Sequence, residues 1–129
     1  RMFLGYYNRL EALISKLAIE LSGNFKYYNK YQRRQMQIFQ SLDILMSHNI
    51  FDKYIYAKID EFRRYRNALV HSTNPEFVSS TIYKDLKEVY EKLEIIYTCQ
   101  KNNSGNIENA ISSLSTYCQE HLPNNSINK

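Results

Sequence analysis

Apolar residues recur at alternating intervals of three and four along this chain, and this constrains its fold more than any other feature. In the first segment they are Phe3, Tyr7, Leu10, Ile14, Leu17 and Leu21. A spacing near 3.6 residues places them on one face of an α-helix. Only three glycines and two prolines occur among the 129 residues, which is too few for the many turns of a β-sandwich or barrel. The sequence therefore predicts an all-α fold.

Further segments show the same periodicity. A second helix is expected over residues 27–47, with an apolar face of Tyr28, Tyr31, Met36, Phe39, Leu42 and Leu45. A third is expected from the N-cap Asp52 to His71, because Asn74-Pro75 prevents continuation. A fourth follows Ser80 and extends to about residue 100, and a shorter fifth covers residues 107–118. Together they predict an up-and-down bundle of four long helices plus a short C-terminal helix, with one domain over residues 1–122 and a polar tail over 123–129.

Positive charge is concentrated in the middle of the chain. Residues 26–71 contain nine lysines or arginines and four acids, whereas the remainder contains eight basic and nine acidic residues. A basic segment of this kind fits a phosphate-bearing partner such as RNA or DNA, although a solvated helix face explains it equally well. The candidate RNA contacts in this segment are Arg33, Arg34, Arg63 and Arg64.

The remaining composition excludes several classes of protein. No apolar run approaches the roughly 20 residues that span a bilayer, and the N-terminus lacks a signal-peptide pattern, so we expect a cytoplasmic protein without a membrane partner. Cys99 and Cys118 have no metal-ligand spacing, and we expect two buried thiols, although a disulfide between them stays open. Neither a metal nor another cofactor is predicted.

The most informative stretch is the end of the third predicted helix. At about 100° per residue, Asp60, Arg63, Arg64, Asn67 and His71 share one polar face. Arg66 instead continues the apolar line of Ile55, Ile59, Phe62 and Leu69. A guanidinium keeps its proton in proteins, so an arginine at such a position requires an anionic or hydrogen-bonding partner. We expect this arginine to face a second subunit, a cleft or a phosphate.

The sequence Arg66-Asn67-Ala68-Leu69-Val70-His71 resembles the arginine, polar residue, histidine motif of the HEPN superfamily. In that family the histidine follows the arginine by four to six residues near the end of a long helix in a helical bundle. The number of long helices and their order over residues 3–100 fit the same resemblance. One departure is Thr73, since HEPN toxins that pair with nucleotidyltransferase antitoxins usually carry a tyrosine two residues after the histidine.

The resemblance implies a metal-independent endoribonuclease that acts as a homodimer, with the motifs of both subunits in a shared cleft. His71 would then act as the general acid or base, Arg66 would bind the scissile phosphate and Asn67 would orient the site. The expected products are a 2′,3′-cyclic phosphate and a 5′-hydroxyl. Such domains commonly serve as toxins or in defence against phage, with an antitoxin or another regulatory protein as a partner. The alternative is a non-catalytic HEPN-like module that binds RNA or a protein.

Each motif residue also has a purely structural interpretation. His71 is also explained as a histidine at the C-terminus of the helix that faces the last carbonyl groups. Arg66 is explained by an ion pair with an acid on another helix, and Asn67 by a solvated position on the helix surface. On a straight helix, Arg66 and His71 project about 140° apart and about 7.5 Å along the axis. A single phosphate therefore meets both side chains only if the helix end distorts or if a second subunit supplies one of them.

Overall fold

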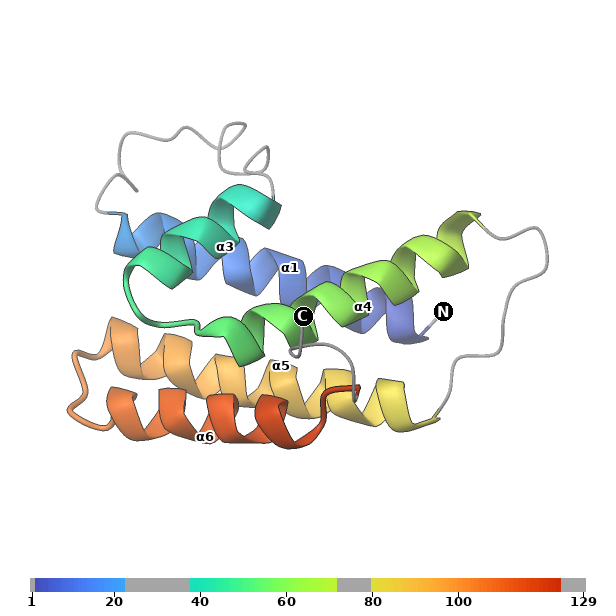
Figure 1. The fold of residues 1–129 in the computed structure, drawn as a ribbon. Helices are drawn as coiled ribbons and strands as arrows, with labels where there is room; N and C mark the ends of the chain where they lie inside the picture. The colour runs from blue at the N-terminus through green and yellow to red at the C-terminus, as the bar shows by residue number, and fades with distance from the viewer. Residues whose placement is uncertain (1, 23–37, 72–79, 124–129) are drawn as a thin grey trace.

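The computed structural model describes residues 2–22, 38–71 and 80–123 (Figure 1). These ranges form α1 (Met2–Leu21), α3 (Ile38–Ser47), α4 (Lys53–His71), α5 (Ser80–Lys101) and α6 (Ile107–Glu120). No strand occurs in these ranges, so the predicted all-α bundle is confirmed. The Asn74-Pro75 break, residues 27–37 of the second predicted helix with Arg33 and Arg34, and residues 124–129 of the tail lie outside the described residues.

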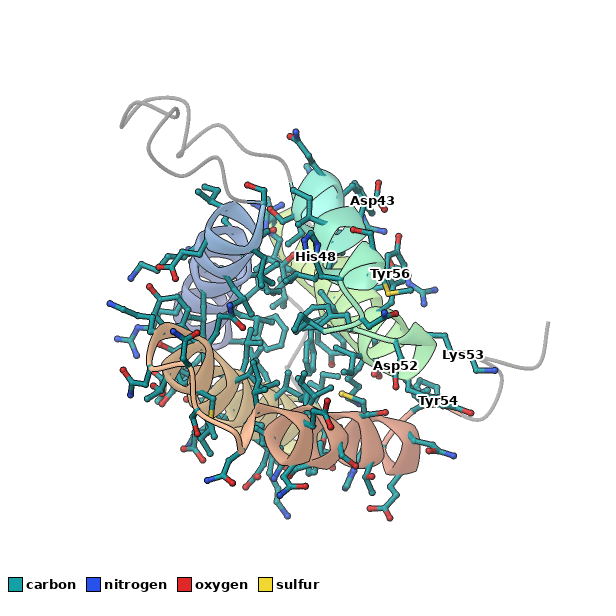
Figure 2. All side chains as sticks on the ribbon, turned by 90° about the vertical axis from the view of Figure 1, so that its left-hand side faces the viewer. Asp43, His48, Asp52, Lys53, Tyr54 and Tyr56 are labelled. Atoms are coloured by element: carbon teal, nitrogen blue, oxygen red, sulfur yellow. The ribbon has the colours of Figure 1, made fainter. Side chains whose placement is uncertain are left out.

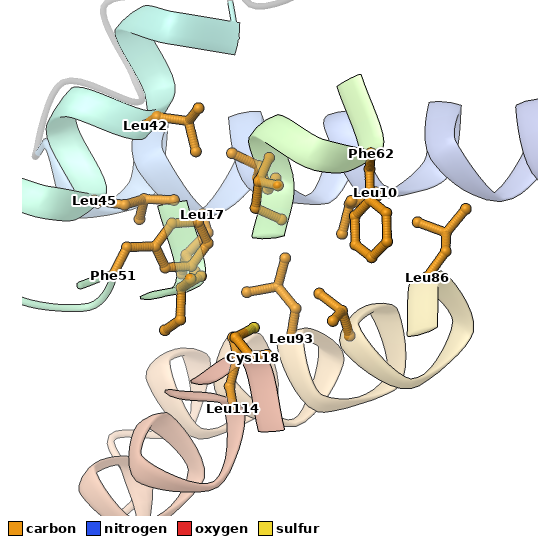
Figure 3. Packing of buried hydrophobic residues seen from close by; sticks show 14 of the residues in the cluster. Leu10, Leu17, Leu42, Leu45, Phe51, Phe62, Leu86, Leu93, Leu114 and Cys118 are labelled. Atoms are coloured by element: carbon orange, nitrogen blue, oxygen red, sulfur yellow. The ribbon is translucent and has the colours of Figure 1, made fainter. Parts of the chain in front are cut away.

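The apolar face predicted for α1 is the face that packs. Its first five members are buried, and only Leu21, at the end of the helix, is half-buried. All five helices contribute to the same hydrophobic cluster, which occupies the space between them (Figure 3). The contributions of the other helices include Leu42 and Leu45 from α3, Phe62 from α4, Leu86 and Leu93 from α5, and Leu114 and Cys118 from α6.

Helix α3 departs from its predicted apolar face at Phe39. Leu42 and Leu45 are buried as expected, but the Phe39 side chain is 46% exposed. Ile38, rather than Phe39, continues the inward line, and one residue along a helix is a rotation of about 100°. Ser41 is buried where α3 approaches α1, with its hydroxyl oxygen 3.3 Å from that of Ser15. The expectation for Phe39 was therefore wrong.

Helix α4 begins with the cap that the sequence predicted. One carboxylate oxygen of Asp52, Oδ1, accepts hydrogen bonds from the backbone N–H groups of Tyr54 and Ile55, both at 3.0 Å. The chain reaches this point through Asn49, whose φ of 60° is a left-handed conformation that asparagine tolerates. Figure 2 views the bundle from the end at which Asp52 and Lys53 start the helix.

From this end α4 runs to the opposite end of the bundle, where Tyr65 meets Phe3 near the start of α1, with ring centroids 5.6 Å apart. Helix α5 begins at that end and returns, and α6 reverses direction again (Figure 1). The last turns of α4, which carry the motif, therefore lie beside the start of α1. None of the helices in the described ranges is both long and apolar enough to cross a membrane.

Candidate functional site on helix α4

Arg66, Asn67 and His71 lie in the last two turns of α4, which stays helical through His71. Arg66 and Asn67 are half-buried, and Arg66 Nη1 donates a hydrogen bond of 3.0 Å to Asn67 Oδ1. His71 is the last residue of the helix and is exposed. The asparagine therefore positions the guanidinium, while the imidazole remains accessible to a ligand.

Arg66 has its hydrogen-bonding partner Asn67 on its own helix, and a buried tyrosine of α1 lies nearby. Tyr7 of α1 is fully buried and donates its hydroxyl proton to Glu11 Oε2 at 2.8 Å. Burial and then this hydrogen bond raise the pKa of Tyr7, while the positive charges of Arg66 and Arg63 oppose the rise. Both guanidinium groups thus lie within electrostatic range of the Tyr7 hydroxyl. In the described part of the chain, no carboxylate lies within 4 Å of Arg66.

Arg63 and Arg64, in contrast, are held by an acid of their own helix. Arg63 Nη2 lies 2.7 Å from Asp60 Oδ1, and Arg64 Nε lies 3.1 Å from Asp60 Oδ2. The Arg63 guanidinium also lies 4.9 Å from the ring centroid of Phe39, which explains how that exposed ring is partly covered. Because Arg64 is 65% exposed, its ion pair is weak and its donors face solvent. The two arginines still bring more positive charge than one Asp60 neutralises.

Helix α4 is continuous through the motif, which bears on the two geometries left open by the sequence. Since the helix is continuous from Lys53 to His71, no distortion within it turns His71 toward Arg66. The two side chains of one chain therefore keep the separation of about 140° and about 7.5 Å expected for a regular helix. Within one chain, the regular helix thus directs the two side chains to different sides of α4.

A second polar cluster, which the sequence reasoning missed, lies among α4, α5 and the end of α6. Lys58 is only 1% exposed, and its Nζ donates three hydrogen bonds: to Glu61 Oε1 at 2.8 Å, to Asp85 Oδ2 at 2.7 Å and to the backbone oxygen of His121 at 2.6 Å. Asp85 is 4% exposed and also accepts a hydrogen bond of 2.9 Å from the Tyr117 hydroxyl. An ammonium group has three protons, so Lys58 has no donor left for a ligand. We therefore infer that this cluster stabilises the packing of the helices and does not bind a ligand.

A signal for the cluster was present in the sequence. Lys58 stands three residues after the buried Ile55 and four before the buried Phe62, and Asp85 has the same relation to Ile82 and Val89. Both charged residues thus occupy positions on the inward line of a helix. A lysine and an aspartate at such positions on two different helices are candidates for a buried pair.

Both cysteines are free thiols, so the alternative of a disulfide is excluded in this structure. Cys118 is buried as expected, whereas Cys99 is half-buried, which corrects the expectation of two buried thiols. Burial raises the pKa of Cys118 to about 12. Within the described ranges, no group of three histidine, cysteine or acidic side chains is arranged to hold a metal ion.

Comparisons of the chain with models of protein families, with curated proteins and with solved structures found no match. The fold and the residues on α4 are therefore the basis of the functional argument.

Proposed function

We propose that this protein is a HEPN-type, metal-independent endoribonuclease that acts as a homodimer on RNA in the cytoplasm. The observation that supports this most directly is the arrangement at the end of α4. There, a guanidinium with no carboxylate partner among the described residues is positioned by Asn67, and the exposed His71 follows on the same helix. A role as a toxin or in phage defence, with an antitoxin or regulatory protein as a partner, belongs to the same proposal.

The reaction uses the ribose next to the scissile phosphate as the nucleophile. The 2′-oxygen attacks phosphorus, the bond from phosphorus to the 5′-oxygen breaks, and the 2′-hydroxyl proton is lost while the departing 5′-oxygen gains a proton. His71 performs one of these proton transfers, because an imidazole ring nitrogen can accept or donate a proton. Arg66 binds the phosphate oxygens and stabilises the charge that develops on them. Since no step uses a metal ion, a chelator leaves the rate unchanged.

The test is cleavage of end-labelled RNA in EDTA by the wild type and by two single variants. We expect His71→Ala to lower the rate about 10²–10⁴-fold and Arg66→Ala about 10²–10³-fold. The matched controls are His48→Ala, which removes another exposed histidine, and Lys53→Ala, which removes a positive charge from the start of α4. Both controls should cleave like the wild type, and circular dichroism should show the same helicity in all five proteins.

The products and the binding behaviour identify the outcome. Fragments ending in a cyclic phosphate, formed by the wild type and the controls only, support the proposal. RNA that is bound but stays intact in every sample contradicts catalysis and favours a non-catalytic binding module. Equal cleavage by wild type and His71→Ala shows a contaminating nuclease and also contradicts the proposal.

The shared cleft makes a separate prediction, because each site takes Arg66 from one subunit and His71 from the other. Neither inactive variant forms a complete site alone. In a mixed dimer, however, the intact His71 of the Arg66→Ala chain meets the intact Arg66 of the His71→Ala chain. Random pairing of equal amounts makes half of the dimers mixed with one good site each, so about a quarter of the wild-type activity should return. If both residues acted within one chain, mixing would restore nothing.

A further inference from the structure

Helices α1 and α5 form the walls of an open groove of about 780 Å³. The two helices lie side by side, across the bundle from the start of α4 (Figure 2). The groove contains apolar side chains, among which Ile95 is 56% exposed although it is a large aliphatic residue. The α1 wall is basic and carries Arg9 and Lys16, whereas the α5 wall is acidic and carries Glu91 and Glu94. These four side chains are exposed.

Helices α1 and α5, which form the two walls, run parallel and keep a constant register along the groove. The ring of Tyr6 lies between those of Tyr83 and Tyr90, with centroids 5.8 and 5.9 Å away. Two to three turns further along, Lys16 Nζ lies 5.3 Å from the ring centroid of Tyr97. Because α1 and α5 advance together, Arg9, which follows Tyr6 by three residues, is level with the segment around Tyr90.

The charges of the two walls do not neutralise each other within the chain. Among the described residues, none of the four charged side chains takes part in an ion pair. Arg9 instead lies over the ring of Tyr6, at 5.3 Å from its centroid, and Lys16 lies over Tyr97. Burial, followed by the adjacent Glu94 carboxylate, raises the pKa of Tyr90. Opposite charges thus face outward from the two rims of one apolar groove.

We propose that this groove binds the same groove of a second copy of the chain, about a twofold axis parallel to α1 and α5. A rotation of 180° about this axis does not shift residues along the helices. It therefore places α1 of one copy opposite α5 of the other, with residues at the same position along the axis facing each other. Arg9 then meets Glu91 of the partner subunit, and Lys16 meets Glu94 of the partner subunit. The exposed Ile95 lies within a turn of the level of the small, exposed Ala12, which leaves room for it across the interface.

The charges favour a twofold axis parallel to the helices, and they favour a second copy of the chain as the occupant of the groove. A twofold axis perpendicular to the helices would set α1 against α1 and α5 against α5, which opposes like charges. RNA is a poor occupant, because Glu91 and Glu94 repel phosphates. The groove and the motif lie on different helices, so this contact is additional to the pairing of two α4 motifs. The inference therefore stands independently of the nuclease proposal.

The experiment measures molar mass by light scattering across a concentration series for the wild type, Arg9→Glu, Glu91→Arg and the double variant. Each single reversal opposes like charges at two symmetry-related places, and we expect about a hundredfold weaker association and half the wild-type mass at micromolar concentration. The double variant exchanges the signs of both members of the pair and should regain the wild-type mass. Lys84→Glu, which reverses an exposed charge of α5 outside the groove, is the matched control and should keep the wild-type mass.

The starting mass separates this contact from the pairing of motifs. If the wild type is a tetramer and the single variants are dimers, both contacts exist. If the wild type is a dimer and the single variants are monomers, the groove contact exists alone. A wild-type mass of 15.4 kDa, which is that of a monomer, or single variants with an unchanged mass, overturns the proposal. A double variant that fails to regain the mass overturns the parallel orientation, and with it the proposal.

Discussion

Replacing Lys58 by methionine tests the buried polar cluster that joins α4, α5 and α6. Methionine has a similar length, so the substitution removes the charge and three hydrogen bonds while leaving little empty space. Among the described residues, Asp85, 4% exposed, then keeps only the hydrogen bond from Tyr117, and the backbone oxygen of His121 loses the Lys58 donor. Breaking a buried pair from one side costs about 3–5 kcal/mol. Because a domain of this kind has about 5–15 kcal/mol in total, the loss is a large fraction of its stability.

The assay is urea unfolding followed by circular dichroism, with the free energy of unfolding extrapolated to water. Lys53→Met is the matched control, because it changes an exposed lysine of the same helix and should alter stability by less than about 0.5 kcal/mol. The double variant Lys58→Met with Asp85→Asn removes both charges and keeps an acceptor for Tyr117. It should be more stable than Lys58→Met alone, because no unpaired carboxylate stays buried.

Two results would refute this reasoning. A loss below about 1 kcal/mol for Lys58→Met would mean that its ammonium group contributes no more than a surface charge. The Asp85→Asn single variant completes the cycle, and a double variant whose loss equals the sum of the two single losses would mean that Lys58 and Asp85 act independently.

Cys118 and Asp52 provide two more tests. At pH 8 a thiol reagent should modify one cysteine of the folded wild type. In a Cys99→Ser variant it should modify no cysteine until urea is added. The reason is that the thiolate is the reactive form and that burial raises the pKa of Cys118 to about 12. Asp52→Ala removes the cap of α4 and the acceptor of the Ser115 hydroxyl, so it should lower the free energy of unfolding by about 1–2 kcal/mol, whereas Asp52→Asn keeps an oxygen acceptor and should lose less. Early reaction of Cys118, or equal losses for both Asp52 variants, would contradict these expectations.

The helices were predictable because their signals are local. In α5 five apolar residues spaced three and four apart in the sequence are all buried: Ile82, Leu86, Val89, Leu93 and Ile96. The start of α4 was predictable for the same reason, since an aspartate caps a helix through backbone groups two and three residues away. Phe39 was misplaced because Ile38 and Phe39 are both apolar, and only the packing of α3 on α1 decides which of them faces inward.

The cluster at Lys58 was not predictable in the same way. Its partners Asp85 and His121 are 27 and 63 residues away, so the contacts depend on how three helices are rotated and spaced. The sequence shows only that a charged residue occupies an inward position on each of two helices. Pairing them requires the tertiary structure.

The three arginines near the end of α4 show how far spacing alone distinguishes a candidate site. Arg63 and Arg64 stand three and four residues after Asp60, which are the separations at which side chains meet on a helix, and both form ion pairs with it. No aspartate or glutamate lies three or four residues before or after Arg66, and the nearby Glu61 accepts a hydrogen bond from Lys58. Of the three, Arg66 is therefore the one whose charge is free of a carboxylate in the described chain, which makes it the strongest candidate for a phosphate ligand.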